Sequence, residues 1–194
     1  MQKTEQIEIQ RGLRGVYIDT TQSSEVMGDI GKLIYCGYNI NDLAQKSTFE
    51  ETVYLLLNSK LPTRSELDAF DSQLRQNREV PEEVVDVIRL VQKAHPMDVM
   101  RTAVSALAAY DPDTADNSPE ATMRKAIRLT AQAPTVVAYH ERIRKGNPLV
   151  KPNADLAFAA NFLYMLSGQV PPEDEARLMD TDFILHADHG SNAS

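Results

Sequence analysis

From about residue 41 onward, apolar side chains recur every three or four positions, which is the spacing of amphipathic helices. Two of the predicted helices open with a capping box, because Thr48 is followed three positions later by Glu51, and Thr63 in the same way by Glu66. The pattern predicts helices in four segments of this part of the chain: TFEETVYLLLNS, TRSELDAFDSQLRQN, PEEVVDVIRLVQKA and PMDVMRTAVSALAAYD.

The helical pattern continues beyond a turn-rich linker, DPDTADNSP. Ser118 and Pro119 are suited to begin a long helix that reaches about Lys145, where a glycine follows. The segment NADLAFAANFLYMLSG is apolar on almost every side, which is typical of a helix in the centre of a core or against a partner chain. The last predicted helix, PPEDEARLMDTDFILHADH, has acidic residues at its start, as the helix dipole favours.

The N-terminal part has a different pattern. Residues 7 to 38 contain short runs of β-branched and aromatic residues, VYIDTT and KLIYCGYNI, separated by glycines. We therefore expect residues 1–40 to form a small hairpin-like β segment and residues 41–194 to form a helical domain. The predicted fold class is all-α with a minor β contribution.

Composition and charge narrow the classes of partner. The 194 residues carry a formal net charge of −8, so the surface has no general affinity for phosphate backbones, and no nucleic-acid partner is expected. The N-terminus is polar and no apolar run approaches the roughly 20 residues that span a bilayer, so no membrane partner is expected. Cys36 is the only cysteine, which fits a reducing cytoplasm.

Two histidines and one acid, Asp188, lie close together in the C-terminal stretch FILHADHGSNAS. If the last helix continues through this stretch, Asp182, His186 and His189 share one face and could hold a metal ion. A second interpretation is an anion or carbonyl site, because imidazoles donate hydrogen bonds to such groups. In a third, His186 only satisfies a structural contact and His189 is solvated. Of the other histidines, His95 is expected to cap the helix that follows it, and His140 to be exposed.

Several stretches together resemble the N-terminal half of citrate synthases of the short bacterial and archaeal type, a group that includes 2-methylcitrate synthases. They occur in the family order and cover nearly the whole chain: RGLRGVYIDTT, GKLIYCGYNINDLAQKSTFEETVYLLLNSKLPTRSEL, HPMDVMRTAVSAL, APTVVAYHERIRKG, LAFAANFLYMLSG and ILHADHGSNAS. The resemblance implies an almost entirely helical, two-domain subunit that forms a homodimer through helices near residues 96–110 and 119–145.

The family condenses acetyl-CoA with oxaloacetate to give citrate and CoA by acid–base catalysis, with acetyl-CoA as co-substrate and no permanently bound cofactor or metal. In this resemblance His189 matches the histidine that hydrogen-bonds oxaloacetate, and Asn192 matches a neighbouring substrate contact. Ser194 matches a serine that supports the catalytic histidine, and His186 matches a recurrent histidine with a weaker, more structural role.

The family's catalytic histidine and aspartate, and the small domain that closes over CoA, have no counterpart in these residues. The chain is therefore expected to be a truncated large domain that is inactive alone. The alternatives are a non-catalytic paralogue that pairs with a full-length synthase, and a 2-methylcitrate synthase acting on propionyl-CoA. Cys36 departs from the family pattern, in which many relatives carry arginine.

Overall fold

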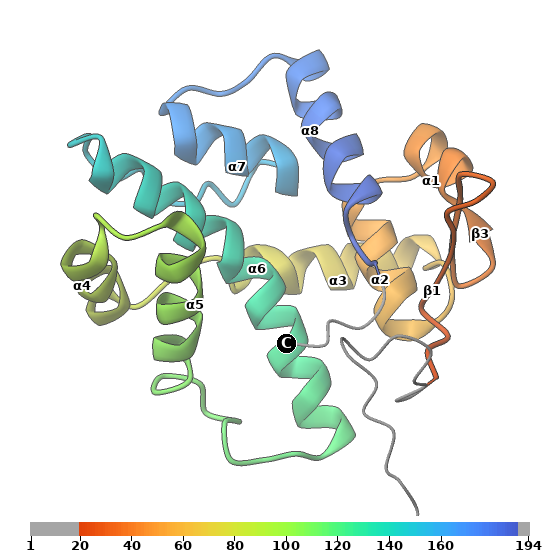
Figure 1. Cartoon of the computed structure of the whole chain (residues 1–194), viewed down its shortest axis with the longest axis horizontal. Helices are drawn as coiled ribbons and strands as arrows, with labels where there is room; N and C mark the ends of the chain where they lie inside the picture. Colours follow the sequence, from red (N-terminus) through yellow and green to blue (C-terminus); the bar gives the residue numbers. More distant parts are fainter. Residues whose placement is uncertain (1–19, 190–194) are drawn as a thin grey trace, which may run out of the picture.

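The computed structural model describes residues 20–189 and consists mainly of helices (Figure 1). The strands are β1 (Ser24–Met27), β2 (Lys32–Tyr35) and β3 (Tyr38–Asn39). The helices are α1 (Ile40–Lys46), α2 (Phe49–Asn58), α3 (Arg64–Gln76), α4 (Glu82–Val91), α5 (Pro96–Leu107), α6 (Pro119–Arg144), α7 (Phe158–Ser167) and α8 (Glu173–Leu185). The predicted all-α class with a minor β contribution is confirmed.

Long-range packing is organised around α6, which crosses the molecule diagonally in Figure 1. Helices α4 and α5 pack beside α6, α7 packs on its C-terminal half, and α8 packs on α7. On the other side of the molecule the strands β1, β2 and β3 lie in sequence order in one antiparallel sheet, next to α1. None of the helices within residues 20–189 is long and apolar enough to cross a membrane.

The local signals in the sequence explain where several helices begin. Both predicted capping boxes are present: the Thr48 hydroxyl accepts from the Glu51 amide, and the Glu51 side chain accepts from the Thr48 amide. The Thr63 box is formed in the same way. The His95 side chain accepts from the Met97 amide at 3.3 Å, as expected for the cap of α5. Each of these contacts joins residues that are neighbours in sequence, which is why the sequence could predict them.

One expectation about these helices is wrong. His140, predicted to be exposed, is only 6% exposed, and its Nε2 lies 3.1 Å from the carbonyl oxygen of Gln92. Charged neighbours in the sequence did not report the burial of the histidine, because Arg142, two positions further on, is buried as well.

The buried residues form three clusters, two of which include residues of α6. One lies between α4, α5 and α6, and includes Val84, Val85, Ile88, Val99, Ala103, Leu107, Val136 and Tyr139. The second joins α2 and α3 to α6 through Val53, Phe70, Leu74, Ile127 and Ala131. The third joins the sheet to α1, α2 and α8 through Tyr35, Ile40, Leu43, Leu55 and Ile184. This third cluster fixes the position of the end of α8, and therefore of the segment after it.

Two buried carboxylates connect helices that are distant in sequence. Asp180 in α8 accepts a hydrogen bond from the Phe49 amide, the first amide of α2, at 2.9 Å. Glu50 in α2 accepts in turn from the Phe158 amide, the first amide of α7, at 2.8 Å. The first amides of a helix have no partner inside it, so each carboxylate satisfies a donor that would otherwise be orphaned in the interior.

Burial raises the pKa of Glu50, and the hydrogen bond from Phe158 only partly offsets this. The folded state therefore holds the Glu50 proton more tightly than the unfolded state does. Its contribution to stability is complete below the ordinary carboxyl pKa and is lost as pH rises through the raised folded value.

Glu50→Gln keeps an acceptor for the Phe158 amide but removes this titration. We expect the unfolding free energy of the variant, relative to wild type, to increase as pH is raised from about 4.5, the ordinary value of this carboxyl, and to level off above the folded pKa. Urea unfolding at a series of pH values measures the difference. If the difference in unfolding free energy between the variant and wild type stayed constant across that pH range, the raised pKa of Glu50 would be contradicted.

Arg78, which precedes α4, is almost fully buried and fixes the loop before α7. Its Nη1 donates to the carbonyl oxygens of Asn153 and Leu156 at 2.8 and 2.9 Å. Burial lowers the pKa of Arg78 to about 10, so the guanidinium still carries its charge at neutral pH. The loop that leads into α7 is thereby tied to the start of α4.

Candidate active site

The stretch singled out in the sequence lies where α8 ends. The helix stops at Leu185, and His186 is its C-terminal cap with φ −107° and ψ 9°. His189 therefore lies outside the helix, and the expectation that His186 and His189 share a helix face is wrong. Asn192 and Ser194, the other predicted site residues, lie outside the described residues.

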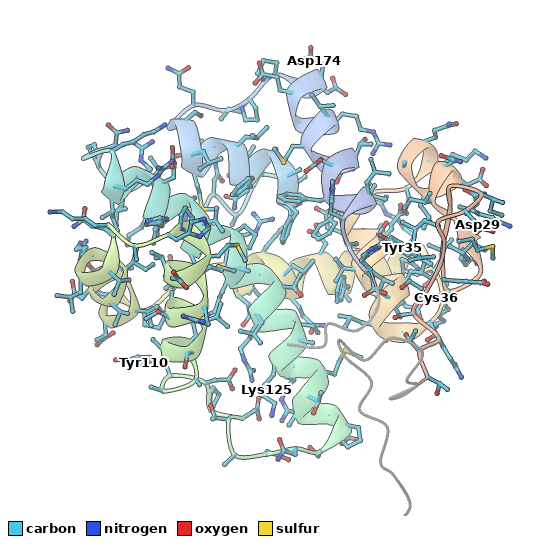
Figure 2. The ribbon with its side chains drawn as sticks, in the orientation of Figure 1. Asp29, Tyr35, Cys36, Tyr110, Lys125 and Asp174 are labelled. Atoms are coloured by element: carbon cyan, nitrogen blue, oxygen red, sulfur yellow. The ribbon has the colours of Figure 1, made fainter. Side chains whose placement is uncertain are left out.

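The segment after α8 is held in place by Tyr35 at the end of β2. The Tyr35 hydroxyl lies 3.2 Å from the carbonyl oxygen of Leu185 and 3.1 Å from that of Asp188, both of which can accept its proton. The same oxygen accepts from the Asp188 amide at 3.2 Å. Figure 2 labels Tyr35 beside the lower end of α8. A side chain of the β segment thus positions a backbone turn 150 residues further along the chain.

Two properties make Tyr35 a firm anchor. Its side chain is completely buried, so solvent does not compete for its hydrogen bonds. Burial also raises the pKa of Tyr35, so the hydroxyl keeps its proton at neutral pH. A second contact acts on the same segment, because the Ser23 hydroxyl donates to the Asp188 carboxylate at 3.0 Å.

The two histidines beside this anchor are exposed. The His186 ring, with 75% of the side chain exposed, donates from Nδ1 to the carbonyl oxygen of Asp182 at 2.9 Å. The same carbonyl also accepts from the His186 amide at 3.2 Å, so the ring adds a second hydrogen bond at the end of α8, which is a structural role. His189 lies on the surface next to the anchored Asp188, where a solute can reach its imidazole.

A metal centre does not assemble in the described part of this segment. The His186 ring and the Asp182 carboxylate approach to 3.4 Å, but no group of three histidine, cysteine or acidic side chains within residues 20–189 is placed to hold a metal ion. The metal interpretation depended on a helix continuing to His189, and the helix ends four residues earlier.

Cys36 occupies a tight turn next to Tyr35. Tyr35 pairs with Tyr38, so Cys36 and Gly37 form a two-residue hairpin loop, and both have positive φ, 46° and 88°. The Cys36 sulfur lies 3.6 Å from the carbonyl oxygens of Ser23 and Leu55, and burial raises the pKa of its thiol. A raised thiol pKa lowers the thiolate fraction at neutral pH, so Cys36 lacks the properties of a nucleophile.

No pattern in the sequence pointed to the supporting role of Tyr35, Ser23 and Asp188. A tyrosine at the end of an apolar strand is an ordinary core residue, so its presence does not indicate a functional segment nearby. Cys36 and Gly37 follow with positive φ, and of the two only the glycine is a residue type that indicates such a conformation. The contact between Tyr35 and Asp188 joins residues 153 positions apart, and no periodicity reports such a pairing.

The described structure defines a helical scaffold with one histidine-bearing segment anchored at the edge of its third cluster. A family model described as "citrate synthase, C-terminal domain" matches residues 12–194. The chain therefore belongs to the citrate synthase family.

Among its relatives, a citrate synthase of Deinococcus radiodurans is 45% identical over 187 residues, which are 96% of this chain and 50% of the relative. A 2-methylcitrate synthase of Mycobacterium tuberculosis is 41% identical over 191 residues, 98% of this chain and 48% of that enzyme. A structure of the Thermoplasma acidophilum citrate synthase in ternary complex with carboxymethyl coenzyme A and oxaloacetate has a TM-score of 0.90 and 26% identity. It covers 96% of this chain and 49% of that one. The chain thus spans about half the length of the relatives it matches.

Proposed function

We propose that this chain is the N-terminal part of a citrate synthase, which joins acetyl-CoA to oxaloacetate and releases citrate and CoA. Family membership supports the class of enzyme, and the names of the relatives support the reaction. The order of the matching stretches, which ends with ILHADHGSNAS, supports the assignment to the N-terminal part. The observation that carries the proposal is the exposed His189, next to a backbone turn that Tyr35 and Ser23 hold in place.

In this proposal His189 donates a hydrogen bond to oxaloacetate, and Asn192 provides a neighbouring contact. Ser194 supports a catalytic histidine that the remaining part of the enzyme supplies, together with the catalytic aspartate. His186 has a weaker role in substrate binding and a more structural one, which agrees with its hydrogen bond to the carbonyl oxygen of Asp182. An anchored segment suits this chemistry because a hydrogen-bond donor that is already oriented loses little entropy when the substrate binds.

We also propose that the enzyme is a cytoplasmic homodimer assembled through α5 and α6, with no permanently bound cofactor. The two helices pack against each other, and large apolar side chains on them, Met97 and Leu129 among these, are exposed. Exposed apolar surface of this kind is favourable to bury against a second copy.

The similarity to a 2-methylcitrate synthase supports a second candidate, in which propionyl-CoA is the preferred acyl donor. The two candidates differ by one methylene in the acyl chain, which a pocket distinguishes by about 10- to 200-fold. A comparison of kcat/KM for the two thioesters therefore separates them.

A chimera tests the proposed function, with this chain replacing the matching half of the Deinococcus radiodurans enzyme. We expect the chimera to release CoA from acetyl-CoA only when oxaloacetate is present, and the 194-residue chain alone to release none. His189→Ala should lower kcat/KM by about 10²- to 10³-fold, the usual cost of losing one hydrogen-bond donor to a developing charge.

His186→Ala is the matched control, because it removes another exposed imidazole from the same segment. Its activity should stay within about twofold of the parent, since substitutions of exposed side chains have small effects. An active chimera that is unaffected by His189→Ala would exclude the proposed role of this residue.

A further inference from the structure

The first turn of α5 is capped by an imidazole, a group that changes its charge near neutral pH. The Met97 amide donates to Nδ1 of His95 at 3.3 Å. Because a backbone amide can only donate, Nδ1 must be unprotonated, and the neutral ring carries its proton on Nε2. The imidazolium form has protons on both nitrogens and offers no acceptor. The capping contact therefore exists only while His95 is neutral.

A positive charge at this position is unfavourable for a second reason. The first amides of a helix point out of its N-terminus and make that end partially positive. His95 is the N-cap residue of α5, so an imidazolium there adds charge of the same sign. Protonation thus removes the acceptor for Met97 and introduces a repulsion, and both effects destabilise the first turn. The caps at Thr48, Thr63 and Ser118, by contrast, are hydroxyl groups that do not titrate.

The charged groups near the start of α5 do not reverse this preference. A hollow of about 380 Å³ beside Pro96 brings side chains of α6 and of the α4–α5 connection together. The two acids of this region are already paired, Asp98 with Arg101 at 3.1 Å and Glu141 with Lys145 at 2.5 Å. The titratable and charged side chains of the region are Lys93 in the connection, Asp98 and Arg101 in α5, and His140, Glu141, Arg144 and Lys145 in α6.

His186 provides an internal comparison, because it caps the opposite end of a helix. Its Nδ1 donates to the carbonyl oxygen of Asp182, so this nitrogen carries a proton in the neutral ring. Protonation at Nε2 leaves that hydrogen bond intact. The C-terminal end of a helix is partially negative, and the Asp182 carboxylate lies 3.4 Å from Nδ1, so positive charge is favourable there. Acid therefore has opposite effects at the two caps: it weakens the start of α5 and strengthens the end of α8.

We propose that His95 is a pH-responsive cap: the neutral imidazole holds the first turn of α5, and protonation releases it. The turn carries Met97, whose side chain is 68% exposed. Because α5 is part of the proposed dimer surface, acid would loosen the turn that presents Met97 to a second copy. This consequence rests on the proposed function, whereas the cap itself depends only on the contact between His95 and Met97.

Nitrogen-15 NMR of the histidine rings in the full 194-residue chain tests the required tautomers. At about pH 8, we expect an unprotonated Nδ1 in His95 and a protonated Nδ1 in His186. As the pH is lowered to about 5, the Met97 amide resonance should shift together with the His95 ring signals, and this shift should be absent in His95→Asn. A proton on Nδ1 of His95 at the higher pH would overturn the proposal.

Urea unfolding measures the effect of the cap on stability. His95→Asn keeps a capping acceptor that does not titrate. Between about pH 8 and about pH 5, the unfolding equilibrium constant of wild type should rise relative to that of His95→Asn by about two- to thirtyfold, which corresponds to the loss of one cap. Groups that titrate elsewhere, Glu50 among them, affect both proteins equally and cancel in this ratio. A ratio that does not change with pH would contradict the proposal.

Two further variants serve as controls. His95→Ala has no cap at any pH, so it should be less stable than wild type at about pH 8 and approach it at about pH 5. In His186→Asn the ratio should move in the opposite direction, by about two- to fivefold, because wild type gains stability there on acidification. Changes of the same sign for His95→Asn and His186→Asn would show a general effect of acid and exclude the cap as its cause.

The exposed positions of His95 and His186 make a loss of folding unexpected in any of these variants. Neither measurement depends on catalysis or on self-association. A failure of the cap proposal is therefore read separately from a failure of the proposed function.

Discussion

Replacing Tyr35 by alanine should lower the free energy of unfolding by about 3–5 kcal/mol, the usual cost of deleting a large buried aromatic side chain. Tyr35→Phe isolates the hydroxyl, and we expect it to cost about 1–3 kcal/mol, because the amide and carbonyl groups of Asp188 lose their partner in a protected site. Urea unfolding measures both values. Tyr38→Phe, at the exposed residue that pairs with Tyr35 in the sheet, should change stability by less than about 0.5 kcal/mol.

The same hydroxyl should control the order of the segment that carries His189. Amide hydrogen exchange at Asp188 is expected to speed up in Tyr35→Phe far more than exchange in α4, which is remote from the anchor. In the active chimera the change should raise KM for oxaloacetate by about tenfold, which corresponds to about 1.4 kcal/mol of lost substrate binding. Unchanged exchange at Asp188 would show that other contacts hold the segment.

Asp180→Ala should lower the free energy of unfolding by about 1–3 kcal/mol, because it removes the acceptor for the first amide of α2 from the interior. It also removes the partner of Arg177, whose Nη1 lies 2.7 Å from the carboxylate. Arg177 keeps its hydrogen bonds to the carbonyl oxygens of Ser47 and Ala44, at 2.8 and 2.6 Å, and it is partly exposed. The Arg177 charge therefore keeps hydrogen-bond partners in the variant, which limits the loss of unfolding free energy.

Asp180→Asn separates hydrogen bonding from charge. Burial raises the pKa of Asp180 despite Phe49 and Arg177, so the buried charge has a cost that asparagine avoids while it retains the acceptor. We expect the asparagine variant to be clearly more stable than the alanine variant at neutral pH. Asp182→Ala, at an exposed acid on the same helix, should shift stability by no more than about 0.5 kcal/mol. Equal losses for alanine and asparagine would exclude the capping role.

The local features of this fold could be read directly from the sequence. The capping boxes at Thr48 and Thr63 and the cap at His95 are confirmed, as is the long helix that begins after Ser118. Each depends on side chains and amides that are two to four residues apart, so the residue types at that spacing are sufficient to specify the structure. The all-α class follows from the same regularity, repeated along the chain.

The candidate site was only partly predictable. The sequence singled out the histidine-bearing segment as a candidate, but the predicted extension of α8 to His189 was wrong, because the helix ends at Leu185. The segment departs from the helix where the turn is held by the Tyr35 hydroxyl, a contact between residues that are distant in sequence. A local pattern predicts where a helix is favourable, but it does not report a competing long-range hydrogen bond.

By itself, the sequence determined the helical class, the positions of most helix starts and membership of the citrate synthase family. Only the tertiary structure decided that Glu50 and Asp180 cap helices far from them in sequence, that His140 is buried, and that Tyr35 positions the segment beside His189. The physical reason is the same for each. Burial and long-range hydrogen bonds depend on which surfaces the packed helices bring together, and residue spacing along the chain does not contain that information.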